Sequence, residues 1–591
     1  MANGRQWTHG PSFEAGGVRF RLWAPGEARV ALALADRPEP VAMERRDEGF
    51  FEVFAEGVGA GARYRFQLAD GTRVADPASR FQPDDVHGAS ETVDPEAYRW
   101  SETWTGVAWE DVVLYELHLG AFSRAGTFDG AAEMLDYLAT VGVTAVEIMP
   151  VADFPGARNW GYDGVFLYAP DASYGRPERF KAFVEAAHGR GVAVILDVVY
   201  NHFGPDGNVL PRVAPEFFTS RHQTPWGEAI NFDGPNARPV RDFVIENAEY
   251  WLEEFHLDGL RLDAVHAIRD DSRPDILDEL AMRVRARFDR PIHLLLENET
   301  NAPGRLRREE GRPALYTAQW NDDVHHVLRV AATGQKTGYY VDYGETRLLA
   351  RALAEGFAYQ GQPSLHRGAP RGSPSADLPP TAFVAFVQNH DQVGNRAFGE
   401  RLGALASPAA ARALASVVLL LPQIPALFMG EEWGAEQPFL FFCDFSGELA
   451  TAVREGRRRE FSNFPEFSDP EGAAKIPDPL AEQTFLDSKL DWGKLDAERL
   501  AVTRAAIAAR RAHVIPLLAD IGRAGEAIEI GDQAVRVRWT AGTKSLILDA
   551  NLEDRAQGFP PASGQVIWRS GDAGDSGELG PWAVRWSVVA P

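Results

Sequence analysis

The sequence is poor in cysteine: Cys443 is the one cysteine among 591 residues. An intramolecular disulfide is therefore excluded, and the fold does not depend on oxidation. A lone cysteine could serve as a nucleophile, but nothing in the residues around it indicates an activated thiolate. We therefore expect no catalytic role for Cys443.

The chain also lacks an unbroken apolar run of membrane-spanning length. Its most apolar stretch, residues 413–429, is interrupted by Pro422, Gln423 and Pro425. This pattern favours a buried helix followed by a buried strand over a membrane span. The first residues, MANGRQWTHGPS, contain no apolar segment typical of a secretory signal. We therefore predict no membrane association and a cytoplasmic location.

Positive charge is in the minority, with 60 Lys and Arg against 85 Asp and Glu and a net charge of −25. No basic stripe suited to nucleic acid is present. A field of this sign would also repel a polyanionic substrate, although the acidity could serve solubility alone. We therefore expect a neutral substrate, no nucleic-acid partner and no obligate protein partner.

Several catalytic motifs are missing from the sequence. It contains no H-E-x-x-H, no paired C-x-x-C, no phosphate-binding G-x-x-x-x-G-K-[ST] loop and no G-x-S-x-G elbow. His325 and His326 are adjacent, and adjacent side chains on a helix do not share a face. Metal-dependent hydrolysis, nucleotide use and serine chemistry therefore lack support, and we predict no cofactor and no metal.

Strand patterns open and close the chain. Segments 18–25, 29–36, 50–57 and 63–71 are short, largely alternating and bounded by turn residues. They predict an N-terminal β-sandwich over residues 1–98, immunoglobulin-like and similar to carbohydrate-binding modules. The pattern returns after a long helical segment and predicts a small C-terminal β-sandwich over residues 516–591.

Between these ends, eight short apolar runs alternate with helical patterns. Continuous apolar strands separated by helices indicate a parallel sheet that is covered on both faces. Eight such units over about 400 residues predict a (β/α)₈ barrel, which we place over residues 99–515. A doubly wound open sheet is the alternative; it is disfavoured because polar residues cluster where several strands end. The runs begin at Val112, Ala145, Val192, Leu260, His293, Ala314, Phe383 and Ile424.

Two loops of the predicted barrel are long. Residues 201–234 follow the third strand and are rich in Gly, Pro and Asn, which predicts an inserted subdomain over about 201–245. Residues 366–380 are rich in Pro, Gly and Ser. They could form a plain linker, but inside a compact barrel we expect an ordered flap.

Carboxylates stand where three of the predicted strands end. Asp263 lies two residues after Arg261, so both side chains share a face, and a neighbouring arginine favours the ionised carboxylate that a nucleophile requires. Glu297 follows three leucines, and such surroundings raise the pKa of a carboxyl, which suits a general acid. Asp391 lies beside His390. Each alone could be a helix cap or a solvated charge, but together they favour glycoside cleavage, which needs two carboxyl groups.

A second group of residues lies near these carboxylates. Asp197, Asn201 and His202 end the third strand in ILDVVYNH, and Tyr162 offers a ring suited to sugar stacking. A neutral His202 could donate to a sugar hydroxyl or be purely structural. Three tryptophans are candidates for a sugar platform or for the core: Trp160, Trp320 and Trp433.

The segments DVVYNH, GLRLDAVH, LLLENE and QNHD resemble, in this order, the four short conserved regions of the α-amylase superfamily of glycoside hydrolases. The resemblance implies a retaining double displacement. It implies that Asp263 is the nucleophile, that Glu297 is the general acid/base, and that Asp391 binds sugar hydroxyls and stabilises the transition state. It also places a set of side chains around the same sugar: Arg261, His202, His390 and, beneath the ring, Tyr162.

A narrower resemblance covers nearly the whole chain. DPASRFQPDDVHG, FPGARNWGYDGV, QWNDDVHH, QNHDQVGNR and FMGEEWG are similar to segments of the malto-oligosyltrehalose trehalohydrolase family. Such enzymes cleave the α-1,4 bond next to the terminal trehalose unit of malto-oligosyltrehalose, releasing trehalose and a malto-oligosaccharide. With this resemblance, the predicted substrate-binding residues are Tyr162, Asp197, His202, Arg261, His266, Trp320, Asp322, His390 and Arg396.

Three other functions are alternatives to hydrolysis next to trehalose. An α-1,4-glucan branching enzyme shares the sandwich, barrel and carboxylates, but the QNHDQVGNR context of Asp391 is unlike it; a debranching enzyme is disfavoured on similar grounds. A non-catalytic glycan-binding protein would have lost a carboxylate, and all three are present.

Asn201 matches a calcium-ligand position of many α-amylases, but its loop offers no obvious cluster of further oxygen ligands, which favours a site without metal.

Overall fold

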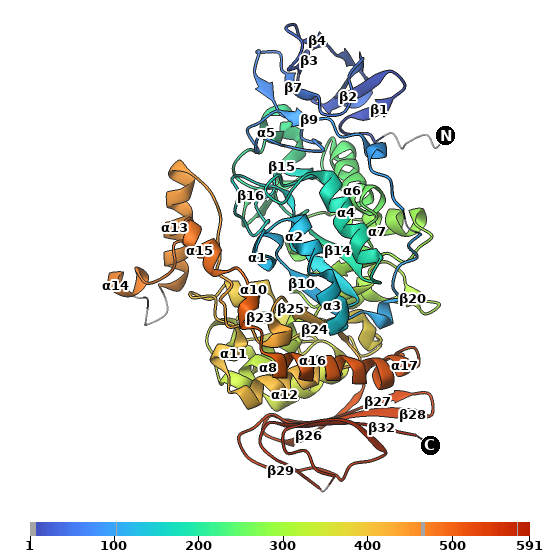
Figure 1. Cartoon of the computed structure of the whole chain (residues 1–591), viewed down its shortest axis with the longest axis vertical. Helices are drawn as coiled ribbons and strands as arrows, with labels where there is room; N and C mark the ends of the chain where they lie inside the picture. The colour runs from blue at the N-terminus through green and yellow to red at the C-terminus, as the bar shows by residue number, and fades with distance from the viewer. Residues whose placement is uncertain (1–6, 102, 463–466, 468, 576, 591) are drawn as a thin grey trace.

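The computed structural model of the chain describes residues 7–590 except 102, 463–466, 468 and 576. The remaining residues of the two predicted end domains, 1–6 and 591, lie outside the described residues. A β-sandwich, a barrel wrapped in helices and a C-terminal sheet follow one another along the long axis of the molecule (Figure 1).

The N-terminal part consists of two antiparallel sheets packed face to face. Short alternating strands bury one side chain in two, and Tyr64 and Phe66 of β7 point into the sandwich. The predicted sandwich is confirmed. The sheets are β1 (Ser12–Glu14), β2 (Gly17–Trp23), β6 (Phe50–Glu56) and β5 (Glu44–Arg45), and β4 (Val41–Ala42), β3 (Ala31–Leu34), β7 (Arg63–Gln67) and β8 (Arg73–Val74), with β9 (Ser90–Glu91) beside β7.

Eight parallel strands close into a barrel, because β10 pairs with β25 as well as with β11. Each strand coincides with one of the eight predicted apolar runs, β17 beginning one residue before its run, so the predicted barrel is confirmed. In barrel order the strands are β10 (Leu114–Leu117), β11 (Ala145–Ile148), β14 (Ala193–Val198), β17 (Gly259–Leu262), β18 (His293–Leu296), β21 (Ala318–Trp320), β24 (Phe383–Phe386) and β25 (Ile424–Phe428).

The inside of the barrel changes character along its axis. Its lower part is an apolar cluster that includes Leu114, Ala145 and Ile195. Since side chains alternate along a strand, the residues two positions further on also face inward. These residues carry charge, so a polar layer lies directly above the apolar floor: Glu116, Glu147, Asp197 and, on β17, Arg261.

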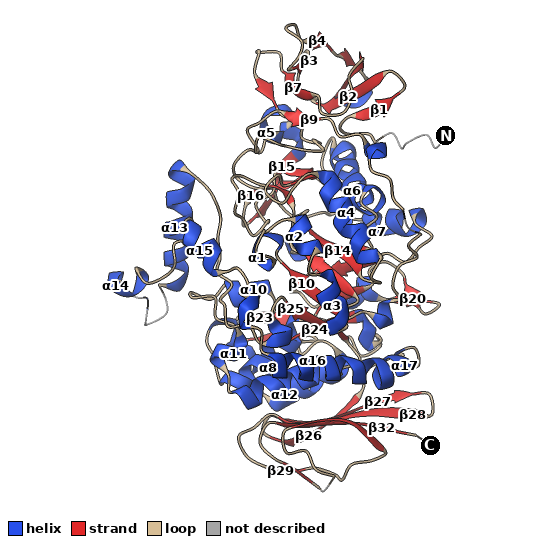
Figure 2. Cartoon of the chain, in the orientation of Figure 1, coloured by secondary structure: helices blue, strands red, loops and turns tan. Residues whose placement is uncertain are grey.

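Helices cover the outside of the barrel (Figure 2). The apolar run 413–429 forms helix α12 and strand β25, as predicted. No helix in the described part of the chain is long and apolar enough to cross a membrane. The connection from β18 to β21 departs from the expected alternation and carries a short hairpin, β19 (Arg308–Glu309) and β20 (Arg312–Pro313). The larger covering helices are α3 (Leu135–Val141), α4 (Pro177–His188), α6 (Ala237–Glu254), α7 (Ile276–Arg287), α8 (Asp322–Thr333), α9 (Thr346–Glu355), α12 (Pro408–Val418) and α16 (Ala497–Ala509).

The long segment after β14 is ordered. It forms the short helix α5 (Leu210–Val213) and a hairpin of β15 (Phe218–Thr224) and β16 (Gly227–Ile230) before α6 begins. Arg212 donates to Glu27 at 2.9 Å and to Asp70 at 2.6 Å, and both acceptors belong to the N-terminal sandwich. The inserted segment is therefore tied to the first sheet pair as well as to the barrel.

The second long loop is also ordered. β22 (Gln362–Ser364) and β23 (Ala369–Arg371) form a hairpin, and Arg371 is buried beneath it against Asp323 at 3.0 Å. This agrees with the expected flap rather than with a linker.

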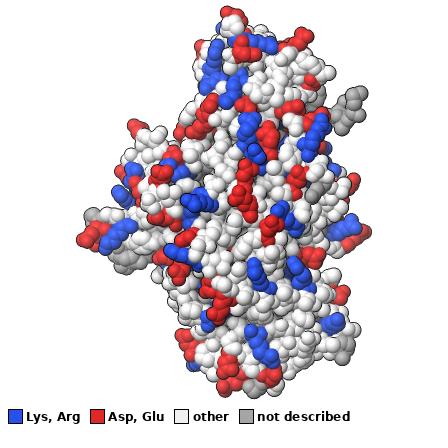
Figure 3. Space-filling model, in the orientation of Figure 1, with Lys and Arg blue, Asp and Glu red and all other residues white. Residues whose placement is uncertain are grey.

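The C-terminal part is a five-stranded antiparallel sheet laid against the helices of the barrel. Trp586 donates to the carbonyl of Ser416 in α12 at 3.0 Å, and its ring stacks on Trp539. On the visible face of the molecule, acidic and basic side chains are interspersed over all three parts (Figure 3). The sheet order is β26 (Glu526–Gly531), β27 (Ala534–Ala541), β28 (Lys544–Asn551), β32 (Ala583–Val589) and β30 (Gln565–Ser570), beside a pair of β29 (Gln557–Gly558) and β31 (Glu578–Leu579).

The buried ion pair of this sheet provides a stability test. Asp549 accepts from Arg585 at 2.8 Å, and neither side chain is exposed. The substitution Asp549→Ala leaves a buried guanidinium without its carboxylate and should lower the free energy of unfolding of the sheet by about 3–5 kcal/mol. Hydrogen exchange of β27, β28 and β32 measures this loss. Glu345→Ala is the control, since its pair with Arg347 is exposed to solvent and should contribute little to stability. Equal effects of the two substitutions would contradict the prediction.

Candidate active site

The predicted nucleophile lies where β17 ends at the mouth of the barrel. Asp263 accepts a hydrogen bond from Arg261 Nη1 at 2.7 Å and another from Asn201 Nδ2 at 2.9 Å. Two donors, one on β17 and one just after β14, fix the orientation of the carboxylate. The sequence placed Asn201 near the carboxylates and at a calcium-ligand position; in the structure its amide donates to Asp263.

The predicted general acid lies at the end of the neighbouring strand, β18. Glu297 accepts from the backbone N–H of Ala264 at 2.5 Å, and Ala264 has a left-handed backbone with φ of 40°. Such a conformation is unusual for a residue with a side chain and is typical of functional sites. Burial, reinforced by the carboxylate of Asp263, raises the pKa of Glu297 well above its ordinary value despite the nearby Arg261. A raised pKa of this kind is what a general acid requires.

Arg261 connects these groups from below. It is 2% exposed, its Nη1 also donates to Asp197 at 2.8 Å, and its Nη2 lies 4.0 Å from Glu297 Oε2. Both oxygens of Asp197 accept hydrogen bonds, from Arg261 and from Tyr162 at 2.7 Å. Asp197, predicted as a substrate contact, is thus placed to hold the groups above it.

Trp320 does not lie where a sugar platform was predicted. Its ring is 2% exposed inside the barrel, 4.4 Å below the guanidinium of Arg261, in a cation–π contact. A ring in this position cannot meet a substrate, because Arg261 lies between them. The two other candidate tryptophans, Trp160 and Trp433, are also buried in the core, at 5% and 1% exposure.

A second buried pair supports the opposite side of the site. His390 Nδ1 meets Glu116 at 2.5 Å, and Glu116 also accepts from the His390 backbone N–H at 3.0 Å. Burial acts to lower the pKa of His390, but the Glu116 carboxylate more than offsets it, so the net shift is upward. His390 Nε2 lies 2.9 Å from the hydroxyl of Tyr162, and the two rings stack. Sequence reasoning missed Glu116; a charged residue inside the first apolar run was the available signal.

The third carboxylate, Asp391, is exposed at the mouth in the first turn of α10 (His390–Gly394). Asn389 and Gln392 cap this short helix reciprocally, and Gln392 also donates to Asp322 at 3.1 Å. Burial and the nearby Asp391 raise the pKa of Asp322 to about 7. Two acidic side chains therefore face each other at this rim.

The two remaining predicted substrate contacts, Arg396 and His266, lie against acidic residues other than the three predicted catalytic carboxylates. Arg396 pairs with Glu400 at 3.1 Å, four residues further along the chain. His266 lies 3.6 Å from Glu299, and burial lowers its pKa, which favours the neutral ring. Glu299 in turn pairs with Arg367 of the flap at 2.7 Å, so His266 marks where the flap meets the site.

An aromatic side chain that sequence reasoning missed lies over His202. Trp226, in the turn between β15 and β16, stacks on the His202 ring with centroids 4.2 Å apart and an angle of 1°. Its side chain is 51% exposed. Burial lowers the pKa of His202, so the ring is neutral. The inserted hairpin thus presents a large exposed ring beside the carboxylates.

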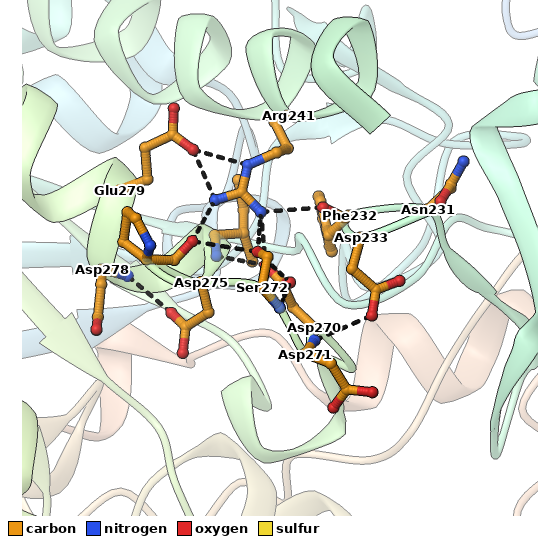
Figure 4. Close-up of polar contacts among 12 residues, drawn as sticks. Asn231, Phe232, Asp233, Arg241, Asp270, Asp271, Ser272, Asp275, Asp278 and Glu279 are labelled. Atoms are coloured by element: carbon orange, nitrogen blue, oxygen red, sulfur yellow. Dashed lines mark hydrogen bonds and ion pairs between the residues drawn. The ribbon is translucent and has the colours of Figure 1, made fainter. Parts of the chain in front are cut away.

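Arg241 of α6 fixes the end of this inserted hairpin (Figure 4). It donates to the carbonyl of Phe232 at 3.0 Å, to Asp270 at 2.7 Å and to Glu279 at 2.7 Å. One buried guanidinium therefore joins the segment after β16 to the loop after β17 and to helix α7.

Beside this junction, His222, Asp233 and Asp271 form a group whose chemistry could suit a metal ion. Asp233 already accepts from His222 at 2.9 Å, from Arg221 at 3.1 Å and from the Asp271 backbone at 3.0 Å. The Arg221 guanidinium supplies the positive charge that a metal would bring. The absence of a metal therefore stays a prediction.

Three family models match segments of the chain. The model of the α-amylase catalytic domain matches residues 65–222. Carbohydrate-binding module 48, described as the isoamylase N-terminal domain, matches residues 6–79. A domain of unknown function, DUF3459, matches residues 522–586.

Named relatives extend over most of the chain. A malto-oligosyltrehalose trehalohydrolase from Saccharolobus solfataricus is 44% identical over 85% of this chain and 87% of its own length. The protein of that name from Deinococcus radiodurans is 44% identical over 82% of this chain and 79% of its own length. A 1,4-alpha-glucan branching enzyme from Corynebacterium glutamicum is 34% identical over 42% of this chain and 37% of its own length.

Solved structures share the arrangement. The crystal structure of a putative α-amylase from Salmonella typhimurium superposes with a TM-score of 0.95, at 44% identity, over 99% of this chain and 100% of that chain. A pullulanase from Paenibacillus barengoltzii complexed with maltotetraose, at 20% identity and a TM-score of 0.74 over 100% of this chain and 96% of that chain, has the same fold.

The protonation of Glu297 can be measured without a substrate. Because burial raises its pKa, the carboxyl should stay protonated at a pH at which exposed glutamates are already ionised. Infrared difference spectra of the wild type minus Glu297→Gln should show its C=O band persisting at this pH. The band should disappear only as the pH rises further. A band lost below about pH 5 would contradict the predicted acid.

The metal prediction has its own test. Overnight incubation with EDTA should leave the melting temperature unchanged, because protein donors already satisfy Asp233. A drop in melting temperature that calcium reverses would refute the prediction. If Asp271→Asn abolished that drop, the metal would be placed beside His222 and Asp233.

Proposed function

Since the chain belongs to the malto-oligosyltrehalose trehalohydrolase family of glycoside hydrolases, we propose that it cleaves the α-1,4 bond next to a terminal trehalose unit, releasing trehalose and a malto-oligosaccharide. The observation that carries the proposal is the pair of unlike carboxyl groups over Arg261. Asp263 receives a charged donor at 2.7 Å, whereas the pKa of Glu297 is raised by burial. A retaining glycosidase needs this combination.

The reaction follows from these two groups. Glu297, protonated, donates its proton to the bridging oxygen while a carboxylate oxygen of Asp263 attacks the anomeric carbon, and the trehalose leaves. The resulting glucosyl ester is then attacked by water, which gives up a proton to Glu297, and Asp263 is released. Two displacements retain the α-configuration. Arg261, held by Asp197, keeps the attacking carboxylate in place through both steps.

The mouth offers groups suited to a neutral glucan. Trp226 presents an exposed ring beside neutral His202, and sugars bind aromatic faces through their apolar C–H groups. Asp322 and Asp391 supply acceptors for hydroxyl groups on the opposite rim. We propose that the inserted hairpin and the flap flank the bound chain, with the carboxylates between them.

We also propose domain boundaries and a cellular location for the protein. The sandwich of residues 1–98 is proposed as a glycan-binding domain, residues 99–515 as the catalytic domain and residues 516–591 as a C-terminal domain; strand β9 ends at Glu91 and β26 starts at Glu526. A cytoplasmic location is proposed because a chain with one cysteine, Cys443, needs no oxidising compartment to fold.

Product analysis tests the function. Incubation with maltopentaosyl trehalose should release trehalose and maltopentaose, with little action on maltopentaose itself, as measured by chromatography. Asp263→Ala should lower turnover at least roughly a thousandfold, because it removes the nucleophile, while the melting temperature stays close to that of the wild type. Branched products would indicate a branching enzyme. Equal cutting of both substrates would indicate an amylase-like activity, and near-normal turnover by Asp263→Ala would refute the nucleophile.

A further inference from the structure

The polar layer inside the barrel contains a carboxyl group to which the proposed reaction gives no role. Glu147 lies on β11, where it pairs in strand register with Glu116 on β10 and Ile195 on β14. It is 1% exposed, and neither of its oxygens has a hydrogen-bond partner among the described residues. A buried polar group without partners is costly and rare, so its retention requires an explanation.

Two unpartnered donors lie beside this acceptor. Arg261 Nε and Trp320 Nε1 are also buried and have no hydrogen-bond partner among the described residues. Both residues act electrostatically or by hydrogen bonding on Glu147. Two buried donors and a buried carboxyl without partners match the polar groups that a single buried water binds, since such a water typically makes about three hydrogen bonds.

The neighbours also determine the form that Glu147 takes. Glu116 on β10 and Asp197 on β14 carry like charges, while Arg261 on β17 and Trp320 on β21 face it from the other side. Burial, reinforced by Glu116 and Asp197, raises the pKa of Glu147 well above its ordinary value, although Arg261 acts against the shift. The group is therefore a neutral acid, with one O–H donor and one carbonyl acceptor.

We propose that neutral Glu147 is a positioning residue of the active site, which fixes Arg261 and Trp320 from below through a shared buried water and so holds the nucleophile Asp263 in line. The inference rests on the proposed function, since it assigns the support of the same nucleophile.

The contacts of Arg261 explain why its underside matters. Nη1 alone donates to both Asp197 and Asp263, and the guanidinium carbon lies 4.4 Å from the centre of the Trp320 ring. The hydrogen bonds of Arg261 to described residues all stand on Nη1, and the Nη2 contact with Glu297 is longer, at 4.0 Å, so no hydrogen bond at Nε opposes a tilt about the Nη1 end. A contact at Nε, on the opposite edge, removes this freedom. Because Asp263 takes its orientation from Nη1, a tilt of Arg261 displaces the attacking oxygen.

Two substitutions separate hydrogen bonding from charge. Glu147→Gln keeps a donor and an acceptor in nearly the same volume, so its kcat should stay within about threefold of the wild type. Glu147→Leu removes both, and kcat should fall roughly 10- to 100-fold, the scale of a small misplacement of reacting groups, with little change in KM. The melting temperature of both variants is measured alongside, because a loss of kcat in a variant that melts close to the wild type reports misplacement of the reacting groups and not unfolding.

The pH profile gives a readout that a merely structural role would not change. With Arg261 less firmly placed, the ionised nucleophile is less stabilised, so the acidic limb of kcat/KM should move to higher pH in Glu147→Leu and stay in place in Glu147→Gln. Asp153→Asn is the matched control, since Asp153 is also buried with an unpartnered oxygen and a raised pKa but belongs to β12 (Ala152–Asp153), outside the site. Its kinetics should equal those of the wild type.

The outcomes are distinct. Wild-type kcat and an unmoved acidic limb in Glu147→Leu would overturn the proposal, and so would a Gln variant as slow as the Leu variant, because charge would then be what matters. If the Leu variant does not fold, Glu147→Met takes its place with the same expectations. All variants are compared on whichever glucosidic bond the wild type cleaves, so a different substrate would refute the proposed function and leave this inference open to the same test.

Discussion

The active site depends on one buried cation. Arg261 donates from a single nitrogen to both Asp197 and Asp263. A second nitrogen lies 4.0 Å from Glu297, and the guanidinium makes a cation–π contact with Trp320. Without it, several carboxyl groups would face one another in the closed end of a barrel, where like charges cannot all ionise. With it, Asp263 receives a charged donor at 2.7 Å, while Glu297 lies 4.0 Å from the guanidinium and has a pKa raised by burial. The division of labour between the two carboxyls is thus an electrostatic consequence of where one guanidinium lies.

A barrel suits this arrangement because its interior is layered. The apolar floor of residues such as Leu114 and Ile195 excludes water from below, and the strand period brings charged side chains into the next layer from adjacent strands. Charges in such a layer interact strongly, since little solvent screens them. The cost is a set of buried polar groups that only mutual pairing can satisfy, and Glu116 with His390 shows one such pairing.

Sequence reasoning could predict what periodicity and local chemistry determine. Eight apolar runs predicted eight strands, and residues at their ends, such as Asp263 and Glu297, were predicted to converge because parallel strands end at one mouth. It could not predict whether a tryptophan ring would point into the barrel or toward the substrate mouth. Trp320 was expected to meet substrate, but it ends a strand and points inward, whereas Trp226 lies in a polar turn whose position depends on a distant arginine, Arg241. Contacts of that kind are tertiary and leave no periodic signal.

The tie between the inserted segment and the sandwich has a consequence for how such proteins diverge. Arg212 joins the segment that carries Trp226 to Glu27 and Asp70, and these acceptors lie in loops of the first sheet pair. The N-terminal domain is therefore not an interchangeable module. A lineage that exchanged it for another sandwich would inherit an altered substrate mouth unless the insertion changed with it, so the two segments form one unit of inheritance despite the hundred or so residues of chain between them.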